Sequence, residues 1–465
     1  MFKFADDTES ISHHSDLRKE LYGSRCQILE LLIKKLIVLD NNFWLFPPFL
    51  HAHFRADIIH DNNQSIFCDL GVNLHVFLPF NRQIDLVPKG QFMKQIIAIS
   101  AMCFLTSACQ AQQTGAGPGA PFKTQVMGTF SKPWAMTFFP DGKSALITEK
   151  RGKLLLWEPG GKSVSVSGVP KVAYGGQGGL GDVVLSPDFA VNNLVYLSWV
   201  EGGEDKTSGS VIGMAKLIRG ADGGAALSEM KIIWQQSPKV NGQGHFSHRM
   251  AFSPNGKYLF IGSGERQKFD PAQNMDMNLG KILRLFPDGS IPADNPFFTV
   301  GNPVRSQIWS LGHRNILGLA FDDAGQLWNQ EMGPQGGDEL NLVLEKANYG
   351  YPIVSNGDHY DGRDIPDHRP GDGFEAPKIF WNPVISPAGL MYYNGDLFPK
   401  WKGSMFIGGL SSEALIRVTI NGQTAKKADQ WAMGNRIREV EQGPDGAVWV
   451  LEDGDDARLL KLTPR

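Results

Sequence analysis

Cysteine is scarce in this chain and is confined to its beginning. The four cysteines are Cys26, Cys68, Cys103 and Cys109, and no cysteine follows. The chain beyond residue 110 therefore has no disulfide, no thiolate nucleophile and no cysteine-bound metal. This excludes zinc ribbons, iron–sulfur centres and cysteine proteases from that part of the protein.

An excess of charge of either sign is also missing. The 45 lysines and arginines nearly balance the 48 aspartates and glutamates, which gives a formal net charge of −3. We therefore expect no nucleic-acid partner, because bulk positive charge is what neutralises a phosphate backbone. The chain also lacks a Walker loop, a Gly-x-Gly-x-x-Gly motif after a predicted strand and a Gly-x-Ser-x-Gly motif. ATP-dependent, NAD-dependent and serine-hydrolase chemistry are thus disfavoured.

Glycine is rare only in the first part of the chain. Three glycines lie in residues 1–92, and the other 50 lie beyond. With 42% hydrophobic residues the chain can bury a large core,. Short apolar runs separated by glycine turns favour an all-β fold for the part beyond residue 110.

Residues 93–111 resemble a secretory signal peptide. A short cationic start, Met93-Lys94-Gln95, precedes the apolar run 96–105 and then small residues near a cleavage site,. We therefore expect export to the periplasm or secretion, with membrane attachment only if Cys109 is lipidated; the alternative is a buried N-terminal strand. Because a signal peptide acts at the N-terminus, we interpret residues 1–92 as a non-native upstream extension and assign them no function. Detection of peptides from 1–92 by mass spectrometry would contradict this interpretation.

After a linker at 112–122, residues 123–465 carry a recurring turn signal. It consists of Pro-Asp-Gly or a close variant between short strands, as at 139–142, 186–189, 253–256, 286–289 and 443–446,. Strands are expected on either side, for example at 145–149, 154–157, 194–200 and 258–263. Repeats of this kind predict a six-bladed β-propeller with four-stranded antiparallel blades. In such a fold, functional residues are scattered along the chain and converge near the axis.

Two histidines lie in unusual local sequences. His245 is in the glycine-rich run Asn241-Gly242-Gln243-Gly244-His245, and His313 is in Leu311-Gly312-His313-Arg314-Asn315. A neutral imidazole in a glycine-rich loop can act as a general base near neutral pH. The alternative for each is a structural, hydrogen-bonded core histidine.

Two further patterns suggest ion binding. Glu331 to Glu339 combines three carboxylates with glycines, and oxygen-only ligands suit Ca²⁺,; a solvated acidic turn is the alternative. Arg436 and Arg438, two residues apart on a predicted strand, would share one face and suit a ligand with several carboxylates or phosphates. A surface charge ladder is the alternative for this pair.

From about Phe130 to Leu462, the order of short segments resembles the soluble PQQ-dependent aldose sugar dehydrogenases, relatives of soluble quinoprotein glucose dehydrogenase. The segments are Lys132-Pro133-Trp134-Ala135-Met136, Gly176-Gln177-Gly178-Gly179-Leu180, Gly244-His245-Phe246, Leu279-Gly280-Lys281-Ile282-Leu283-Arg284-Leu285, Gly312-His313-Arg314-Asn315, Gly333-Pro334, Gly336-Gly337-Asp338-Glu339-Leu340-Asn341, Asn348-Tyr349-Gly350 and Arg436-Ile437-Arg438. Each segment alone is weak evidence for this family, but all of them in this order are specific for it. The family fold is a six-bladed propeller, in agreement with the turn pattern.

The resemblance implies roles for individual residues. His245 matches the catalytic base, and Arg314 matches the cation that stabilises developing negative charge on the cofactor carbonyl. The positions that match contacts to PQQ are Gln177, Arg314, Asn315, Tyr360, Arg436 and Arg438. The positions that match Ca²⁺ ligands are Gly333 and Pro334 at the cofactor, and Glu339 and Tyr349 at a second, structural site.

The chain departs from the family pattern at several places. Ser411 stands where the family usually has a lysine that binds PQQ, Met332 and Gln335 replace frequent His and Arg, and Ile316-Leu317-Gly318 replaces Pro-Gln-Gly. Replacing a charged contact by a neutral one costs roughly tenfold in affinity. We therefore expect Ser411 to weaken PQQ binding and Ser411→Lys to strengthen it.

The resemblance implies an exported quinoprotein that oxidises aldose sugars at C1 to lactones with PQQ and calcium and passes electrons to an external acceptor. Two alternatives stay open: a calcium-dependent propeller lactonase, which needs no arginine pair, and a non-catalytic propeller that binds sugar or protein.

Overall fold

The computed structural model describes residues 57–60, 66–69, 119–160, 162–221 and 223–465. Contacts divide the chain into two units, 1–107 and 108–465. In the first unit the described residues form one antiparallel hairpin, β1 (Asp57–His60) and β2 (Ile66–Asp69). The predicted upstream extension (1–92) therefore lies mostly outside the described residues, and the predicted signal peptide (93–111) lies wholly outside them. Of the predicted linker (112–122), 119–122 are described.

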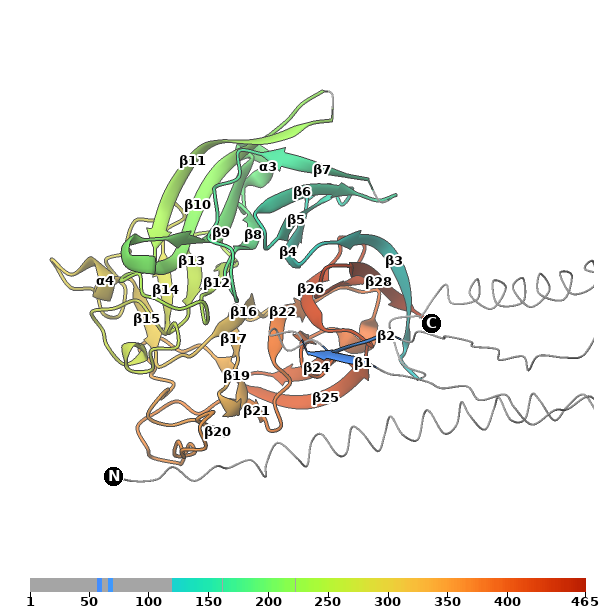
Figure 1. Cartoon of the computed structure of the whole chain (residues 1–465). Coiled ribbons are helices and arrows are strands. Elements are labelled where there is room, and N and C mark those ends of the chain that lie inside the picture. Colours follow the sequence, from blue (N-terminus) through green and yellow to red (C-terminus); the bar gives the residue numbers. More distant parts are fainter. Residues whose placement is uncertain (1–56, 61–65, 70–118, 161, 222) are drawn as a thin grey trace, which may run out of the picture. The chain divides into compact units, whose positions relative to one another are not determined.

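The second unit is almost entirely β-structure, as predicted (Figure 1). Its strands follow one another as four-stranded antiparallel meanders. The first two meanders share an eight-stranded sheet, because the last strands of each, β7 and β11, pair in parallel over two residue pairs. Their strands are β4 (Pro133–Phe138), β5 (Ala145–Glu149), β6 (Lys153–Glu158) and β7 (Lys162–Ser167), followed by β8 (Leu180–Leu185), β9 (Leu194–Gly202), β10 (Ser208–Arg219) and β11 (Ala225–Gln235).

Four more four-stranded sheets follow along the chain. The first holds β12 (Ser247–Phe252), β13 (Leu259–Ser263), β14 (Lys281–Leu285) and β15 (Ile308–Leu311). The second holds β16 (Ile316–Phe321), β17 (Leu327–Glu331), β19 (Asp338–Leu342) and β21 (Ile379–Trp381). The third holds β22 (Pro387–Tyr393), β23 (Ser404–Gly409), β24 (Ala414–Asn421) and β25 (Thr424–Ala432).

The last sheet joins the two ends of the unit. Strands β26 (Ile437–Gln442), β27 (Val448–Glu452) and β28 (Ala457–Pro464) are completed by β3 (Phe122–Phe130), which comes from the beginning of the unit. Among the described residues of the unit, a two-stranded pair, β18 (Gln335–Gly336) with β20 (Gly357–Asp358), and five single-turn helices lie outside these sheets. These are α3 (Phe189–Asn192), η1 (Glu204–Lys206), η2 (Asp270–Ala272), α4 (Pro303–Ser306) and η3 (Pro399–Trp401).

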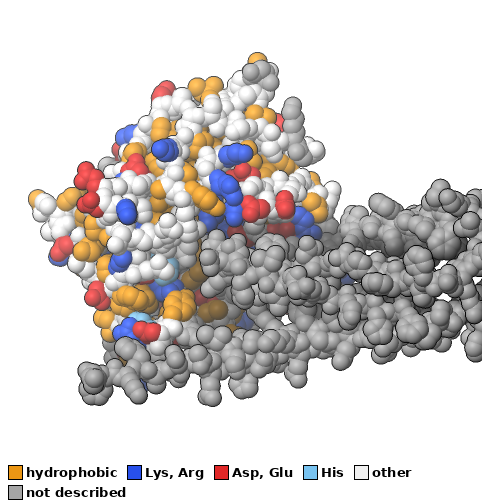
Figure 2. Space-filling view, viewed as in Figure 1, with side chains coloured by type: hydrophobic (Ala, Val, Ile, Leu, Met, Phe, Trp, Pro, Cys, Tyr) orange, Lys and Arg blue, Asp and Glu red, His pale blue; other side chains and the backbone are white. Residues whose placement is uncertain are grey.

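The first strand of each meander lies innermost in a ring (Figure 1). The strands β4, β8, β12, β16, β22 and β26 contact one another in cyclic order, and β26 returns to β4. Hydrophobic clusters fill the space between neighbouring sheets: Trp234 and Ile212 pack with Ile261 and Leu283, for example. Charged side chains of both signs are interspersed on the visible surface (Figure 2).

The predicted turns join the strands as expected. Gly142, Gly256 and Gly446 donate their backbone N–H to the carbonyls of Phe139, Ser253 and Gly443, which closes the β4–β5, β12–β13 and β26–β27 connections. At each of these glycines φ lies between 68° and 77°, a conformation that favours glycine,. These turns lie at one end of the inner strands. The loops that lead into the other end of these strands therefore lie together on the opposite face of the ring.

Candidate active site

A cavity of about 240 Å³ collects predicted cofactor residues from distant parts of the chain. Gln177, Arg436 and Arg438 line it together with the aromatic rings of Trp134 and Phe246. The cavity therefore has flat apolar walls and a cationic side.

The two arginines share one carboxylate partner. Arg436 Nε donates to Asp453 Oδ2 at 2.9 Å, and Arg438 donates to Asp453 Oδ1 through Nε at 3.1 Å and Nη2 at 3.0 Å. β26 begins at Ile437, so Arg436 directly precedes the strand and Arg438 lies within it. The prediction that both side chains share one face is confirmed by their common partner. Arg438 is buried, with 11% of its side chain exposed, whereas Arg436 is 47% exposed at the cavity.

A second cavity of about 200 Å³ holds the predicted catalytic residues. Its lining includes His245, Arg314, Pro334 and Tyr360. Tyr360 is 73% exposed and stands at its rim. The predicted cofactor positions are thus divided between two cavities that adjoin at the loop 245–247, because His245 lines one of them and Phe246 and Ser247 line the other.

His245 is held by two hydrogen bonds. Its backbone N–H donates to Gln177 Oε1 at 2.8 Å, and its Nδ1 bonds to Glu265 Oε1. Burial lowers the pKa of His245, and the Arg314 guanidinium adds to this, while the hydrogen bond to Glu265 opposes it. The imidazole is therefore neutral near pH 7 and donates its Nδ1–H to the carboxylate, so that Nε2 is free to accept a proton.

Glu265 is fixed as an ionised acceptor. Burial would raise its pKa, but the hydrogen bond and charge of His245 and the backbone N–H of Phe269 outweigh burial and leave the pKa lowered. Its second oxygen accepts the N–H groups of Lys268 at 2.5 Å and Phe269 at 2.7 Å. A carboxylate held on both oxygens fixes the tautomer and the direction of the His245 ring.

The two loops that carry this pair contain an unusual number of left-handed residues. His245, Ser247 and His248 have φ of 49°, 58° and 55°, and Arg266, Gln267 and Phe269 have φ of 58–65°. Left-handed conformations of non-glycine residues cost of order 1 kcal/mol each and gather at functional sites. The strain is thus concentrated on both sides of the His245–Glu265 hydrogen bond.

Arg314 reaches the glycine-rich acidic loop. Its Nη1 donates to the carbonyl of Met332 at 3.0 Å and to that of Gly333 at 2.5 Å. Asn315 is fully buried beside it, accepting from Ser247 Oγ at 3.2 Å. The structure therefore brings His245, Arg314 and Pro334 together at one cavity. Gly333 does not line this cavity but contacts Arg314 through its carbonyl, and Asn315 lies behind the lining.

Oxygen atoms converge where β17 and β19 run side by side. Asn329 pairs with Asn341 and Glu331 pairs with Glu339 across the two strands. The amide oxygens of Asn329 and Asn341 are buried without a hydrogen-bond partner. Burial and the charge of Glu331 raise the pKa of Glu339 well above its ordinary value. Amide oxygens without a hydrogen-bond partner and a carboxylate without a neighbouring cation are suitable ligands for a hard cation such as Ca²⁺.

Tyr349 and His313 flank this oxygen cluster. The two rings stack at 4.5 Å, and His313 Nδ1 bonds to Glu331 Oε1 at 2.8 Å while its Nε2 bonds to Ser310 Oγ. The Tyr349 hydroxyl donates to the Leu342 carbonyl. His313 is therefore a fully buried structural histidine, the alternative given for it above. Among the described residues, no three His, Cys, Asp or Glu side chains form a metal-binding group, so a cation here would use mixed carboxylate, amide and backbone oxygens.

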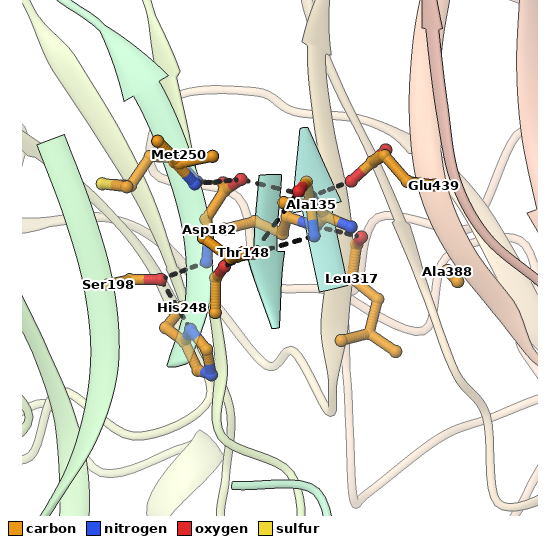
Figure 3. A network of polar contacts seen from close by, with 12 residues as sticks. Ala135, Thr148, Asp182, Ser198, His248, Met250, Leu317, Ala388 and Glu439 are labelled. Atoms are coloured by element: carbon orange, nitrogen blue, oxygen red, sulfur yellow. Dashed lines mark hydrogen bonds and ion pairs between the residues drawn. The ribbon is translucent and has the colours of Figure 1, made fainter. Parts of the chain in front are cut away.

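Sequence reasoning missed several residues of the two cavities. Lys150 and Asp453 directly follow β5 and β27, and Glu265 follows β13 after one intervening residue; each of these is the second strand of a meander. Aligning the meanders with one another would have found them, because equivalent strand ends reach the same face of the ring. His248 was also missed: it lines the first cavity and stacks on Trp134 at 5.0 Å, and its Nδ1 bonds to Ser198 Oγ (Figure 3).

Known proteins are similar to this chain over most of its second unit. The family model described as Glucose / Sorbosone dehydrogenase matches residues 130–461. The chain is 38% identical over 364 residues to aldose sugar dehydrogenase YliI of Escherichia coli K12, which covers 77% of this chain and 96% of that protein. It is 29% identical to quinoprotein glucose dehydrogenase B of Acinetobacter calcoaceticus over 64% of this chain and 66% of that protein.

Solved structures give the same result. The apo-form of the soluble aldose sugar dehydrogenase from Escherichia coli matches with a TM-score of 0.70 over 74% of this chain and 100% of that chain, at 38% identity. The PQQ-bound aldose sugar dehydrogenase from Streptomyces coelicolor matches with a TM-score of 0.59 over 75% of this chain and 100% of that chain, at 28% identity. The chain belongs to the glucose/sorbosone dehydrogenase family and is a sugar dehydrogenase.

Proposed function

We propose that the protein oxidises aldose sugars at C1 to lactones with PQQ as the oxidant and Ca²⁺ as a bound cation. The observation that carries this proposal is the placement of a neutral, carboxylate-oriented histidine beside a cavity with aromatic walls and a cationic side. The PQQ-bound relative from Streptomyces coelicolor supports the choice of cofactor.

The residues of the first cavity fit PQQ. This cofactor is a flat tricarboxylate, and the cavity offers an aromatic lining from Trp134 and Phe246 and the guanidinium groups of Arg436 and Arg438 for its carboxylates,. Asp453 accepts hydrogen bonds from only some of the guanidinium N–H groups, since Arg436 donates to it through Nε alone. The same surplus of cations argues against a lactonase, whose substrate carries no carboxylate.

The residues also fit calcium at two places. Gly333 and Pro334 would offer backbone carbonyls near the cofactor, at a turn so tight that a Cβ on Gly333 would lie 2.2 Å from the Gly336 oxygen. Glu339, the unpaired amide oxygens of Asn329 and Asn341, and the Tyr349 segment would hold a second ion,. At the first place the Arg314 guanidinium now contacts the Gly333 carbonyl, so we expect it to turn away when the ion binds.

The chain's own residues then divide the reaction between them. His245 Nε2 accepts the proton of the anomeric hydroxyl, and Glu265 holds the resulting imidazolium in place. Arg314 supplies positive charge where an oxygen gains negative charge. PQQ, when bound, accepts the hydride that leaves C1, so the sugar loses one hydride and one proton and becomes the lactone. The second cavity, with Tyr360, Tyr351 and Phe269 around it, would seat the sugar ring.

Three further features belong to this proposal. The eight-stranded sheet counts as two blades, because its halves meet only through the two residue pairs of β7 and β11, and the fold is then a six-bladed propeller. The protein is exported to the periplasm or secreted, with residues 93–111 as the signal, and no helix among the described residues is long and apolar enough to cross a membrane. An external redox partner takes the electrons.

Reconstitution tests the proposal. Purified apoprotein is incubated with Ca²⁺ and PQQ, and the quinone spectrum and dye reduction are followed on addition of aldoses. We expect a spectrum that the sugar bleaches and turnover that needs both PQQ and calcium. Absence of PQQ binding at saturating cofactor would remove the dehydrogenase proposal, and lactone hydrolysis without PQQ would establish the lactonase instead. Arg436→Ala and Arg438→Ala should each weaken PQQ binding by about 1.5–3 kcal/mol.

A further inference from the structure

Lys150 lies in the cationic cavity but has no role in the site as derived so far. It follows directly after β5, at the turn into β6, and lines the same cavity as Arg436 and Arg438. Its Nζ donates to the Gly176 carbonyl at 3.0 Å, next to Gln177. The ammonium is therefore at the cavity wall, although the backbone of Lys150 is far from both arginines in sequence.

The backbone of Lys150 is fixed on both sides. Its N–H donates to the Lys132 carbonyl and its carbonyl accepts from Leu180 N–H, each at 2.9 Å. Gly179 passes so close that a Cβ there would lie 2.1 Å from the Lys150 oxygen. The fold thus fixes the point from which this side chain starts, and the hydrogen bond to Gly176 places its ammonium at the cavity.

The charges of the cavity do not balance. Lys150, Arg436 and Arg438 face one carboxylate, Asp453, and both arginines are bonded to it. Of the residues that the structure describes, none forms an ion pair with Lys150. Burial and the charge of Arg438 lower the pKa of Lys150 to about 8, Asp453 opposes this, and Lys132 and Arg436 add to it. Unneutralised positive charge in a half-buried cavity is costly, so this site calls for an anion.

Ser411 is not placed to supply a contact there. It is exposed, and its Oγ donates to the Val384 carbonyl at 3.4 Å while the neighbouring Leu410 lines the cavity. The family's usual lysine is thus absent from the chain at that position, and Lys150, the residue after β5, lines the cavity instead.

We propose that Lys150 binds a carboxylate of the cofactor and so provides the third cation of its tricarboxylate site, in place of the lysine that Ser411 replaces. This inference rests on the proposed function, because it takes PQQ as the anion. It reverses the expectation from the sequence that Ser411 leaves the site one cation short.

The test is a titration of calcium-loaded apoprotein with PQQ, followed by quenching of tryptophan fluorescence and by calorimetry, without any sugar. Lys150→Met keeps the length of the side chain and removes its charge, and it should weaken PQQ binding about tenfold. Lys150→Arg should stay within about threefold of the wild type, because the charge is kept. Lys132→Met is the matched control: Lys132 is a nearby lysine paired with Asp455 at 3.3 Å outside the cavity lining, and its loss should change affinity less than twofold.

Two further measurements separate the explanations. The trimethyl ester of PQQ has no carboxylate, so the wild type and Lys150→Met should bind it equally. Ser411→Lys in the wild-type background should change PQQ affinity less than twofold. Equal binding of PQQ by folded Lys150→Met and wild type, an equal loss in Lys132→Met, or a tenfold gain in Ser411→Lys would each overturn the inference. If the wild type bound no PQQ, the proposed function would fail before the role of Lys150 came into question.

Discussion

At the scale of single residues, the environment of His245 decides its chemistry. Burial and Arg314 favour the neutral imidazole, and Glu265 selects the tautomer with its proton on Nδ1. His248, only three residues away, is also neutral, because burial lowers its pKa to about 3, but its Nδ1 bonds to a serine hydroxyl and not to a carboxylate. The two histidines thus differ in whether a partner can stabilise the imidazolium, and only His245 has one.

Replacing His245 should separate chemistry from binding. We expect His245→Ala to lower the rate of the chemical step by about 10²–10⁴ while PQQ affinity changes little. Because His245 has φ of 49°, His245→Asn is a useful second variant, since asparagine tolerates this conformation,. Stopped-flow reduction of the cofactor by sugar and a PQQ titration measure the two effects. Loss of PQQ binding in a folded variant would make His245 a cofactor contact and not the base.

Glu265 should act through His245, and its effect should appear in the pH profile. Its hydrogen bond raises the pKa of His245, so Glu265→Gln removes that effect and lets burial lower the pKa further. The acid limb of the kcat/KM profile, which lies below the ordinary histidine value of about 6.5, should move to still lower pH. The rate at the plateau should fall about 10- to 100-fold because the ring is less well oriented. Glu265→Asp should recover part of it; an unmoved limb would mean that Glu265 has only a structural role.

At the scale of elements, the ends of the second strands carry several charged residues of the site. β5 ends at Glu149 before Lys150, β13 is followed by Gly264-Glu265, β17 ends at Glu331, and β27 ends at Glu452 before Asp453. The sequence allowed the strands and their Pro-Asp-Gly turns to be predicted because these are local signals. It did not identify Lys150, Glu265 or Asp453, because each gains its role from contacts at least 15 residues away.

His245, Arg314 and the arginine pair were predictable from the sequence only through their resemblance to a family. Composition and spacing left His245 and the arginine pair with a structural alternative, and His313, which also directly follows a glycine, took that alternative. The two histidines differ in the hydrogen bonding of Nε2. Both ring nitrogens of His313 are bonded, to Glu331 and Ser310, whereas His245 is bonded only at Nδ1. A local sequence does not contain that difference.

The turn between β17 and β19 should tolerate no side chain at Gly333. An added Cβ would lie 2.2 Å and 2.3 Å from the backbone oxygens of Gly336 and Gly337. Gly333→Ala should therefore open the turn, lower the free energy of unfolding by about 1–3 kcal/mol and weaken calcium-dependent PQQ binding. Gly325→Ala is the control: it has φ of 75° and nothing within 4 Å, so only backbone strain is added,. Thermal unfolding with and without calcium measures the difference, and equal losses in both variants would contradict the steric explanation.

At the scale of the whole molecule, one buried arginine ties the inner strands together. Arg249 of β12 donates to Asp182 of β8 at 3.2 Å and to the Leu317 carbonyl of β16 at 2.8 Å, and it also bonds to Glu439 of β26 (Figure 3). Its guanidinium lies 4.0 Å from the centre of the Trp134 ring on β4. Five of the strands that form the ring thus meet at one side chain, while β3 closes the ring at its edge by pairing with β28.

Removing Arg249 should destabilise the fold strongly. Arg249→Met keeps much of the side-chain volume but leaves Asp182 and Glu439 buried without a cation, and we expect a loss of about 3–5 kcal/mol in the free energy of unfolding at neutral pH. Arg151→Met is the control, because Arg151 is an exposed arginine whose ion pair with Asp455 spans 3.6 Å, and its loss should stay within about 0.5 kcal/mol,. Denaturant unfolding of both variants measures these values.

The loss from Arg249→Met should also depend on pH in a defined direction. Burial raises the pKa of Glu439 to about 7 and raises that of Asp182 above its ordinary value, and Arg249 opposes both shifts. The folded state therefore binds these protons more tightly than the unfolded chain does, and stability falls as the pH rises from the ordinary carboxyl range through about 7,. Without Arg249 both pKa values rise further, so at about pH 5 the two carboxyls are neutral. The variant therefore loses less free energy of unfolding at about pH 5 than at about pH 8.

A double variant tests this explanation. Adding Glu439→Gln to Arg249→Met removes one of the two buried charges and should recover part of the stability at about pH 8 and little at about pH 5. A loss that is equal at both pH values would mean that the arginine acts through packing on Trp134 and not through its charge.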